Sequence, residues 1–187
     1  MKTLVTSVLL IAGTASLGLA QCKTPSRPNP QSPAANTSAT INGKEIRIFY
    51  SAPSVRGRKI FGGSGALQPD GSVWRLGADN ATCLHTEAAL DIGGVNVAPG
   101  DYSLYVDLDQ GKWKLIVNKK TGQWGINMDG STTDDPSQDV GRAAMTMSKP
   151  SAPVETLKIT VSATGGNKGK IQAEWENVVA SVPITAK

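Results

Sequence analysis

Arginine and aromatic side chains are concentrated in one stretch rich in glycine and proline, residues 50–82. Arg56, Arg58 and Arg75 lie in it, and Trp74 immediately precedes Arg75. A guanidinium group offers a planar fork of donors that suits a carboxylate, sulfate or phosphate, and it also stacks on aromatic rings. The stretch therefore predicts a binding site for an anionic small molecule or a glycan beside Trp74. Further residues expected to take part in this site are Asp79, Asn80 and Trp124.

The same arginines also have a structural interpretation. Arg75 would pair with Asp79 inside the domain, while Arg56 and Arg58 would fix a long irregular loop against carbonyl oxygens. Long loops need such polar anchoring whether or not they bind a ligand. The residue types leave both interpretations open.

No complete catalytic constellation stands out in the chain. His85 is the single histidine, which excludes a metal site built from several histidines. We therefore expect no metal and no cofactor, and we favour a non-catalytic module that binds a ligand or an envelope partner. The alternative is an envelope hydrolase that uses Asp79, Asn80 or His85 in a pocket under the arginine-rich loops.

The first twenty residues have the layout of a secretory signal peptide. Lys2 precedes a short apolar run, residues 4–12, and the small residues Gly18 and Ala20 precede a cleavage site. The run is too short to span a bilayer, so we expect no transmembrane segment and a periplasmic or extracellular protein cleaved near Ala20. The net charge of +4 is not gathered in any block of like charge. A nucleic-acid partner is therefore not expected.

Cys22 and Cys83 are the two cysteines of the chain. In an oxidising compartment they can form a disulfide, but the sequence alone does not bring them together. The string 19–22, Leu-Ala-Gln-Cys, resembles a bacterial lipobox, with Gln21 where a small residue is usual. A lipid anchor at Cys22 is therefore the less favoured alternative to ordinary cleavage.

Alternating apolar residues and turn signals predict an all-β chain. The pair Asn42-Gly43 is typical of a tight hairpin, and Ile46, Ile48 and Tyr50 follow it on one face of a strand. Similar patterns recur to the end of the chain without helical periodicity. We expect nine or ten strands in an antiparallel β-sandwich, with a jelly roll as one candidate topology. The expected divisions are a signal peptide (1–20), a disordered Pro/Ser/Asn-rich tether (21–38) and one sandwich domain (39–187).

Several strings in the domain resemble one exported bacterial family, domain of unknown function 2911. They are residues 50–63, 73–82, Pro99-Gly100-Asp101-Tyr102-Ser103-Leu104 and Gln123-Trp124-Gly125. The resemblance implies an exported, all-β protein and no established activity. Members of the family commonly read Gly-Ala-Asn-Glu-Ala-Thr where this chain reads Gly-Ala-Asp-Asn-Ala-Thr, residues 77–82. Neighbouring residues on a strand face opposite sides, so Asp79 need not replace that Glu.

Overall fold

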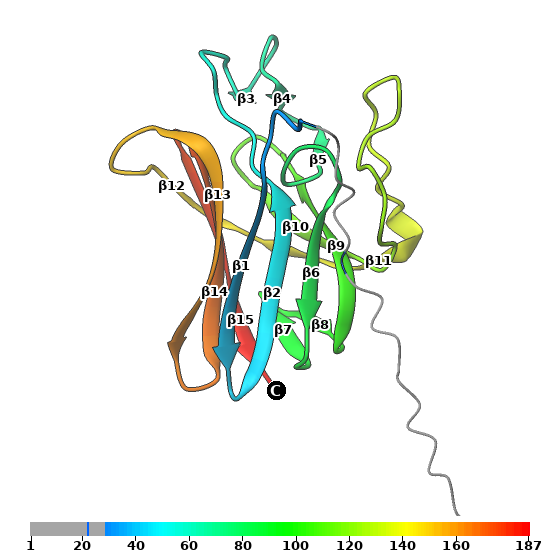
Figure 1. The fold of residues 1–187 in the computed structure, drawn as a ribbon, viewed down its shortest axis with the longest axis vertical. Helices are drawn as coiled ribbons and strands as arrows, with labels where there is room; N and C mark the ends of the chain where they lie inside the picture. The colour runs from blue at the N-terminus through cyan, green and yellow to red at the C-terminus, as the bar shows by residue number, and fades with distance from the viewer. Residues whose placement is uncertain (1–21, 23–28) are drawn as a thin grey trace, which may run out of the picture.

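The computed structural model describes Cys22 and residues 29–187, and in this part of the chain the protein is a two-layer antiparallel β-sandwich (Figure 1). One sheet contains β1 (Ala34–Ile41), β2 (Lys44–Ser51), β5 (Val73–Trp74), β6 (Thr82–Thr86), β9 (Gly100–Asp107), β10 (Lys114–Asn118) and β11 (Asp139–Ala144). The other contains β7 (Leu90–Ile92), β8 (Val95–Val97), β12 (Thr146–Ser148), β13 (Val154–Gly165), β14 (Lys168–Glu176) and β15 (Val178–Ala186). A short parallel pair, β3 (Phe61–Gly62) and β4 (Gln68–Pro69), and the 3-10 turn η1 (Pro136–Gln138) lie outside both sheets.

The core lies between the two sheets because each strand presents every second side chain to it. Ile46, Ile48 and Tyr50 of β2 are buried, as their alternation predicts. They belong to the same apolar cluster as Ile159 and Val161 of β13, in the opposite sheet. Burying each such aliphatic side chain contributes about 1.5–3 kcal/mol, so this interface is the main source of stability.

The two sheets also meet along both of their edges. On one side, β1 lies beside β13, and the amide of Val161 donates a 3.1 Å hydrogen bond to Thr37 Oγ1. On the other side, β8 lies beside β11, where a Cβ added at Gly141 would come within 2.8 Å of Val95. The edge strands therefore cover one another, which protects their unpaired backbone groups.

The expectation of an all-β sandwich is confirmed, but the number of strands was underestimated. The described part has fifteen strands, and the additional ones are mostly pieces of two or three residues within loops. The Asn42-Gly43 hairpin forms as expected, with positive φ angles of 52° and 73°. The expected start of the domain at residue 39 is too late. Residues 34–38, expected in the tether, pair with β2 as the first part of β1.

Cys22 and Cys83 form a disulfide with a Cα–Cα distance of 5.7 Å. The disulfide links the segment before β1 to β6, and the two cysteines are 61 residues apart in the sequence. Because its sulfur is bonded to Cys83, Cys22 has no thiol for acylation, and the structure does not support the lipid anchor. The expected signal peptide and residues 21 and 23–28 of the expected tether lie outside the described residues. Within the described chain, the structure contains no helix that is long and apolar enough to cross a membrane.

Candidate functional site

A cavity of about 590 Å³ opens at the end of the sandwich where the loops around β3, β4 and β5 gather (Figure 1). Its walls come from the segment before β1, the loop after β2, the stretch 67–78 and the loop after β10. Four of the residues predicted to bind a ligand line it: Arg56, Arg58, Trp74 and Arg75. No Asp or Glu is among the described residues that line it. The cavity is therefore a cationic depression with an aromatic wall.

Arg56 and Arg58 lie at the exposed mouth and donate to uncharged oxygens. Arg56 donates through Nη1 to Gln31 Oε1 (2.9 Å) and through Nη2 to the Gln31 carbonyl (2.8 Å). Arg58 donates through Nε to the Val55 carbonyl (3.1 Å) and through Nη2 to the Ser54 carbonyl (2.6 Å). These bonds fix both guanidinium groups, as the structural interpretation expects. They leave both positive charges in place, because a carbonyl group orients a cation without neutralising it.

Arg75 joins the two loop systems that form the cavity. Its Nη1 donates to the carbonyls of Asp79 (2.6 Å) and Trp124 (3.0 Å), and its guanidinium lies 5.6 Å from the centre of the Trp124 ring. Gly125 packs on the Arg75 side chain so closely that an added Cβ would come within 2.6 Å of Cδ. The predicted members Arg75, Asp79 and Trp124 are thus brought together, with Arg75 as the connection between them.

Trp74, which was expected to lie beside a bound ligand, is part of a buried aromatic cluster. Only 2% of Trp74 is exposed, its Nε1 donates to the Gly77 carbonyl (3.2 Å), and its ring stacks on Trp175 at 5.7 Å. Phe61 packs edge-on against both rings and against Trp113. Trp113 and Trp175 are buried as well. The Trp74–Trp175 pair therefore separates the cavity from the core, and Trp175 is a lining residue that the sequence did not assign to the site.

Three residues of the hydrolase alternative do not line the cavity. Asp79 takes a positive φ of 56°, and Asn80 is 4% exposed. Asn80 Oδ1 has no hydrogen-bond partner among the described protein atoms. His85 faces away from the core on β6, where its Nδ1 lies 2.6 Å from Asp101 Oδ1. The structure therefore does not bring Asp79, Asn80 and His85 together in the cavity.

An acidic cluster, missed in the sequence, holds the loop that supplies Ile126 and Gly130 to the cavity. Asn118 Nδ2 donates to Asp134 Oδ1 (3.2 Å) and Asp139 Oδ1 (2.8 Å). Arg142 contacts three carboxylates, those of Asp107, Asp134 and Asp139. Burial, assisted by the charge of Asp139, raises the pKa of Asp134 to about 6. Among the described residues, no three or more His, Cys, Asp or Glu side chains are grouped so that they could hold a metal ion.

Comparison with known proteins places the chain in one family. The model of the family described as "Protein of unknown function (DUF2911)" matches residues 32–184, so the chain belongs to that family. The match confirms the resemblance seen in the sequence motifs. No match to the chain was found among curated proteins or among solved structures.

Proposed function

We propose that this chain is a non-catalytic binding protein of the cell envelope that takes an anionic ligand in the cavity at the end of the sandwich. The observation that carries the proposal is the charge of the cavity. Arg56, Arg58 and Arg75 line it, and none of its described lining residues is acidic. An anion placed there would meet the guanidinium groups of Arg56 and Arg58, which their hydrogen bonds already hold in position.

The hydrogen bonds of the arginines support binding on energetic grounds. A hydrogen bond to a charged group contributes about 1.5–3 kcal/mol, and fixed donors lose little side-chain entropy when the ligand arrives. Arg58 uses Nε and Nη2 in the protein, so its Nη1 remains as a donor for a ligand. The arginine donors can therefore hold the loop in place and also bind a ligand.

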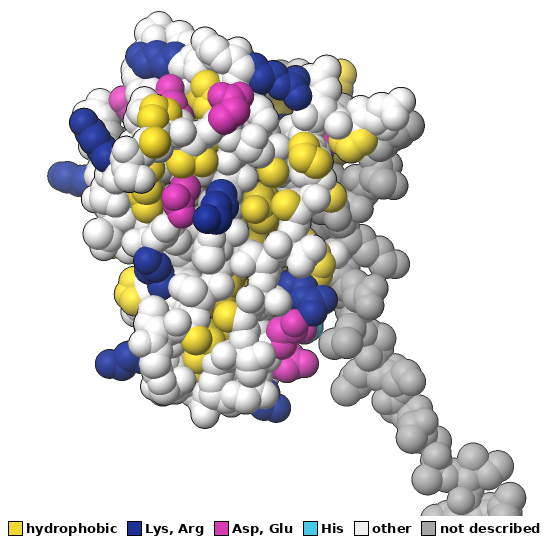
Figure 2. All heavy atoms as spheres, turned by 60° about the vertical axis from the view of Figure 1, so that its left-hand side comes forward, with side chains coloured by type: hydrophobic (Ala, Val, Ile, Leu, Met, Phe, Trp, Pro, Cys, Tyr) yellow, Lys and Arg dark blue, Asp and Glu magenta, His cyan; other side chains and the backbone are white. Residues whose placement is uncertain are grey.

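Export remains part of the proposal. The Cys22–Cys83 disulfide supports an oxidising compartment, since disulfides seldom persist in the cytosol. Figure 2 shows Lys and Arg side chains scattered over one face among acidic and hydrophobic ones, without a continuous basic strip on that face. This distribution supports a localised anion site over a nucleic-acid surface.

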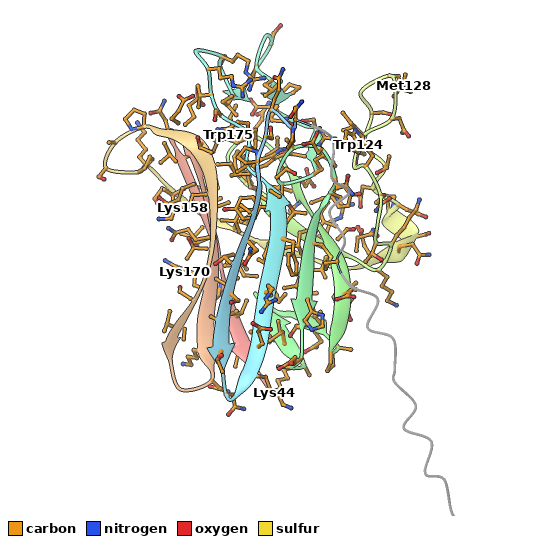
Figure 3. The ribbon with its side chains drawn as sticks, in the orientation of Figure 1. Lys44, Trp124, Met128, Lys158, Lys170 and Trp175 are labelled. Atoms are coloured by element: carbon orange, nitrogen blue, oxygen red, sulfur yellow. A yellow bond between two sulfur atoms is a disulfide. The ribbon has the colours of Figure 1, made fainter. Side chains whose placement is uncertain are left out.

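Calorimetric titration with phosphate, sulfate and glucuronate at low salt tests the proposal. We expect at least one of these anions to bind, and R58Q to weaken its binding about tenfold or more. R58K, which keeps the charge, should retain part of the affinity. K158Q is the matched control, because Lys158 is exposed on β13 and does not line the cavity (Figure 3). Equal binding by R58Q, K158Q and the unaltered protein would refute the proposal.

The same samples separate binding from hydrolysis. Incubation of the protein with glycoside, ester and peptide substrates should yield no product above a blank. Turnover that is lost in D79N or H85Q would favour the hydrolase instead.

A further inference from the structure

The cavity is chemically divided between its mouth and its inner wall. Arg56 and Arg58 are exposed at the mouth, whereas Trp74 and Trp175 are each only 2% exposed. Val73 and Ile126 also line it and are partly buried. A molecule that enters would therefore meet the two arginines and the apolar side chains of Val73 and Ile126, because the two indoles are almost completely buried and offer little surface.

The polar side chains that line the cavity are largely engaged within the protein. Ser54 Oγ lies 2.9 Å from Thr156 Oγ1, Ser72 Oγ donates to the Pro69 carbonyl (2.6 Å), and Gln31 Oε1 accepts from Arg56 (2.9 Å). A sugar ring needs many donors and acceptors around its hydroxyl groups, and hydroxyls left unpaired against Val73 and Ile126 would lose hydration. This pattern argues against a glycan at the inner wall.

The volume argues against a bare inorganic anion as well. At about 590 Å³ the cavity lies within the range of drug-sized ligand sites. Phosphate or sulfate at the arginines would leave the space beside Val73 and Ile126 unfilled. Leu67 also lines the cavity and is 42% exposed. A solvated anion at the arginines would gain no binding energy from this apolar surface.

We infer that the ligand is a small amphipathic anion, an acyl or alkyl chain with one carboxylate or phosphate. Its chain lies inward against Leu67, Val73 and Ile126, and its anionic group stays at the mouth beside Arg56 and Arg58. This inference rests on the proposed anion-binding function and specifies the class of ligand. The opposite orientation would place the charge against these apolar side chains and leave the arginines without an anion.

A chain-length series of straight alkyl carboxylates, from four to ten carbons and below their micelle concentrations, tests the inference by calorimetry. Each buried methylene group should tighten binding about two- to fourfold until the cavity is filled. Decyl phosphate compares the two head groups, and decyltrimethylammonium offers the same chain with the opposite charge. We expect the carboxylate or the phosphate to bind, and the cation to bind at least tenfold more weakly.

Tryptophan fluorescence tests the orientation, since two of the four tryptophans line the cavity. A decanoate brominated at its terminal carbon should quench the emission more strongly than one brominated next to the carboxylate. W124F removes the indole that lies on Arg75 and should keep this difference. Equal quenching by the two isomers, or the reverse order, would overturn the inward placement of the chain.

Two exposed apolar residues provide a matched pair of variants. L67S removes an apolar group that lines the cavity, whereas M128S changes the exposed tip of a neighbouring loop, where Figure 3 shows the Met128 side chain directed away from the sandwich. L67S should weaken decanoate binding several-fold and leave butyrate binding unchanged, and M128S should affect neither. Near-UV circular dichroism confirms that each variant keeps the aromatic cluster.

The outcomes distinguish the inference from the proposed function. Affinity that depends on Arg58 but not on chain length would overturn the amphipathic ligand and keep the anion site. Affinity that rises with chain length but ignores head-group charge would overturn both, and so would the absence of binding by every anion in the two panels.

Discussion

Asp134→Asn should raise the stability of the protein at neutral pH and flatten its dependence on pH. The Asp134 side chain is 2% exposed, and Asp107, Asp135 and Asp139 lie around it with Arg142 as the nearby cation. Burial first and the charge of Asp139 second raise its pKa from 3.8 to about 6. Folding therefore favours the protonated form of this carboxyl group.

The sign and size of the effect follow from linkage. Below about pH 4, Asp134 is protonated in both the folded and the unfolded chain, so its favourable contribution is fully present. Between pH 4 and 6 the unfolded chain loses the proton first, and stability falls as the pH rises. Above about pH 6 the loss is complete. A shift of about two units corresponds to about 3 kcal/mol, which is an upper value for the gain from D134N at pH 7.

Urea denaturation at pH 4, 5, 6 and 7.5 measures this effect as the difference in unfolding free energy between D134N and the unaltered protein. We expect the difference to grow from near zero at pH 4 to its full value above pH 6. D129N is the matched control on the same loop. Hydrogen bonds from Ser131 lower the pKa of the exposed Asp129, so its contribution is lost as the pH falls. A difference for D134N that does not change with pH would refute the reasoning.

Three further changes test the architecture of the site. C22S/C83S should lower the unfolding free energy by about 2–4 kcal/mol relative to the oxidised protein, because the disulfide restricts the unfolded chain; urea titration measures it. W74A should cost about 3–5 kcal/mol and weaken the near-UV dichroism of the aromatic cluster, because it leaves a cavity beside Trp175. G125A should lower the melting temperature by several degrees, since the new methyl group would meet Arg75 on backbone with a φ of +92°.

Each of these results can contradict the structure. An unchanged urea midpoint in C22S/C83S would mean that the disulfide does not constrain the unfolded chain. Retained dichroism and stability in W74A would place that indole outside the core. A G125A protein as stable as the original would show that the close contact with Arg75 relaxes without cost.

Local patterns in the sequence were sufficient to predict much of the fold. The Asn42-Gly43 pair determines its hairpin through backbone geometry, and the alternation around Ile48 and Trp175 identifies buried faces without knowledge of the partner strand. The first part of β1, residues 34–38, was missed because its Ala, Asn, Thr and Ser residues resemble a linker. The strand forms through register with β2 and contact with β13, which composition does not encode.

The lining of the cavity was predicted in part for a similar reason. Clustering in sequence was sufficient to group Arg56, Arg58 and Arg75, because one loop system carries all three. The burial of Trp74 depends on stacking against Trp175, about a hundred residues away in the chain, and no local pattern reports it. The raised pKa of Asp134 likewise depends on how β10, β11 and the intervening loop converge.

The closed edges of the sandwich bear on how the protein can associate with others. Where β1 meets β13 and β8 meets β11, neither sheet presents a long free flank to which a foreign strand could be added. Lateral growth into fibres by strand addition is thus disfavoured by the architecture itself. The loop-bearing end, where we propose the ligand site, can vary in sequence while the sandwich beneath it stays the same.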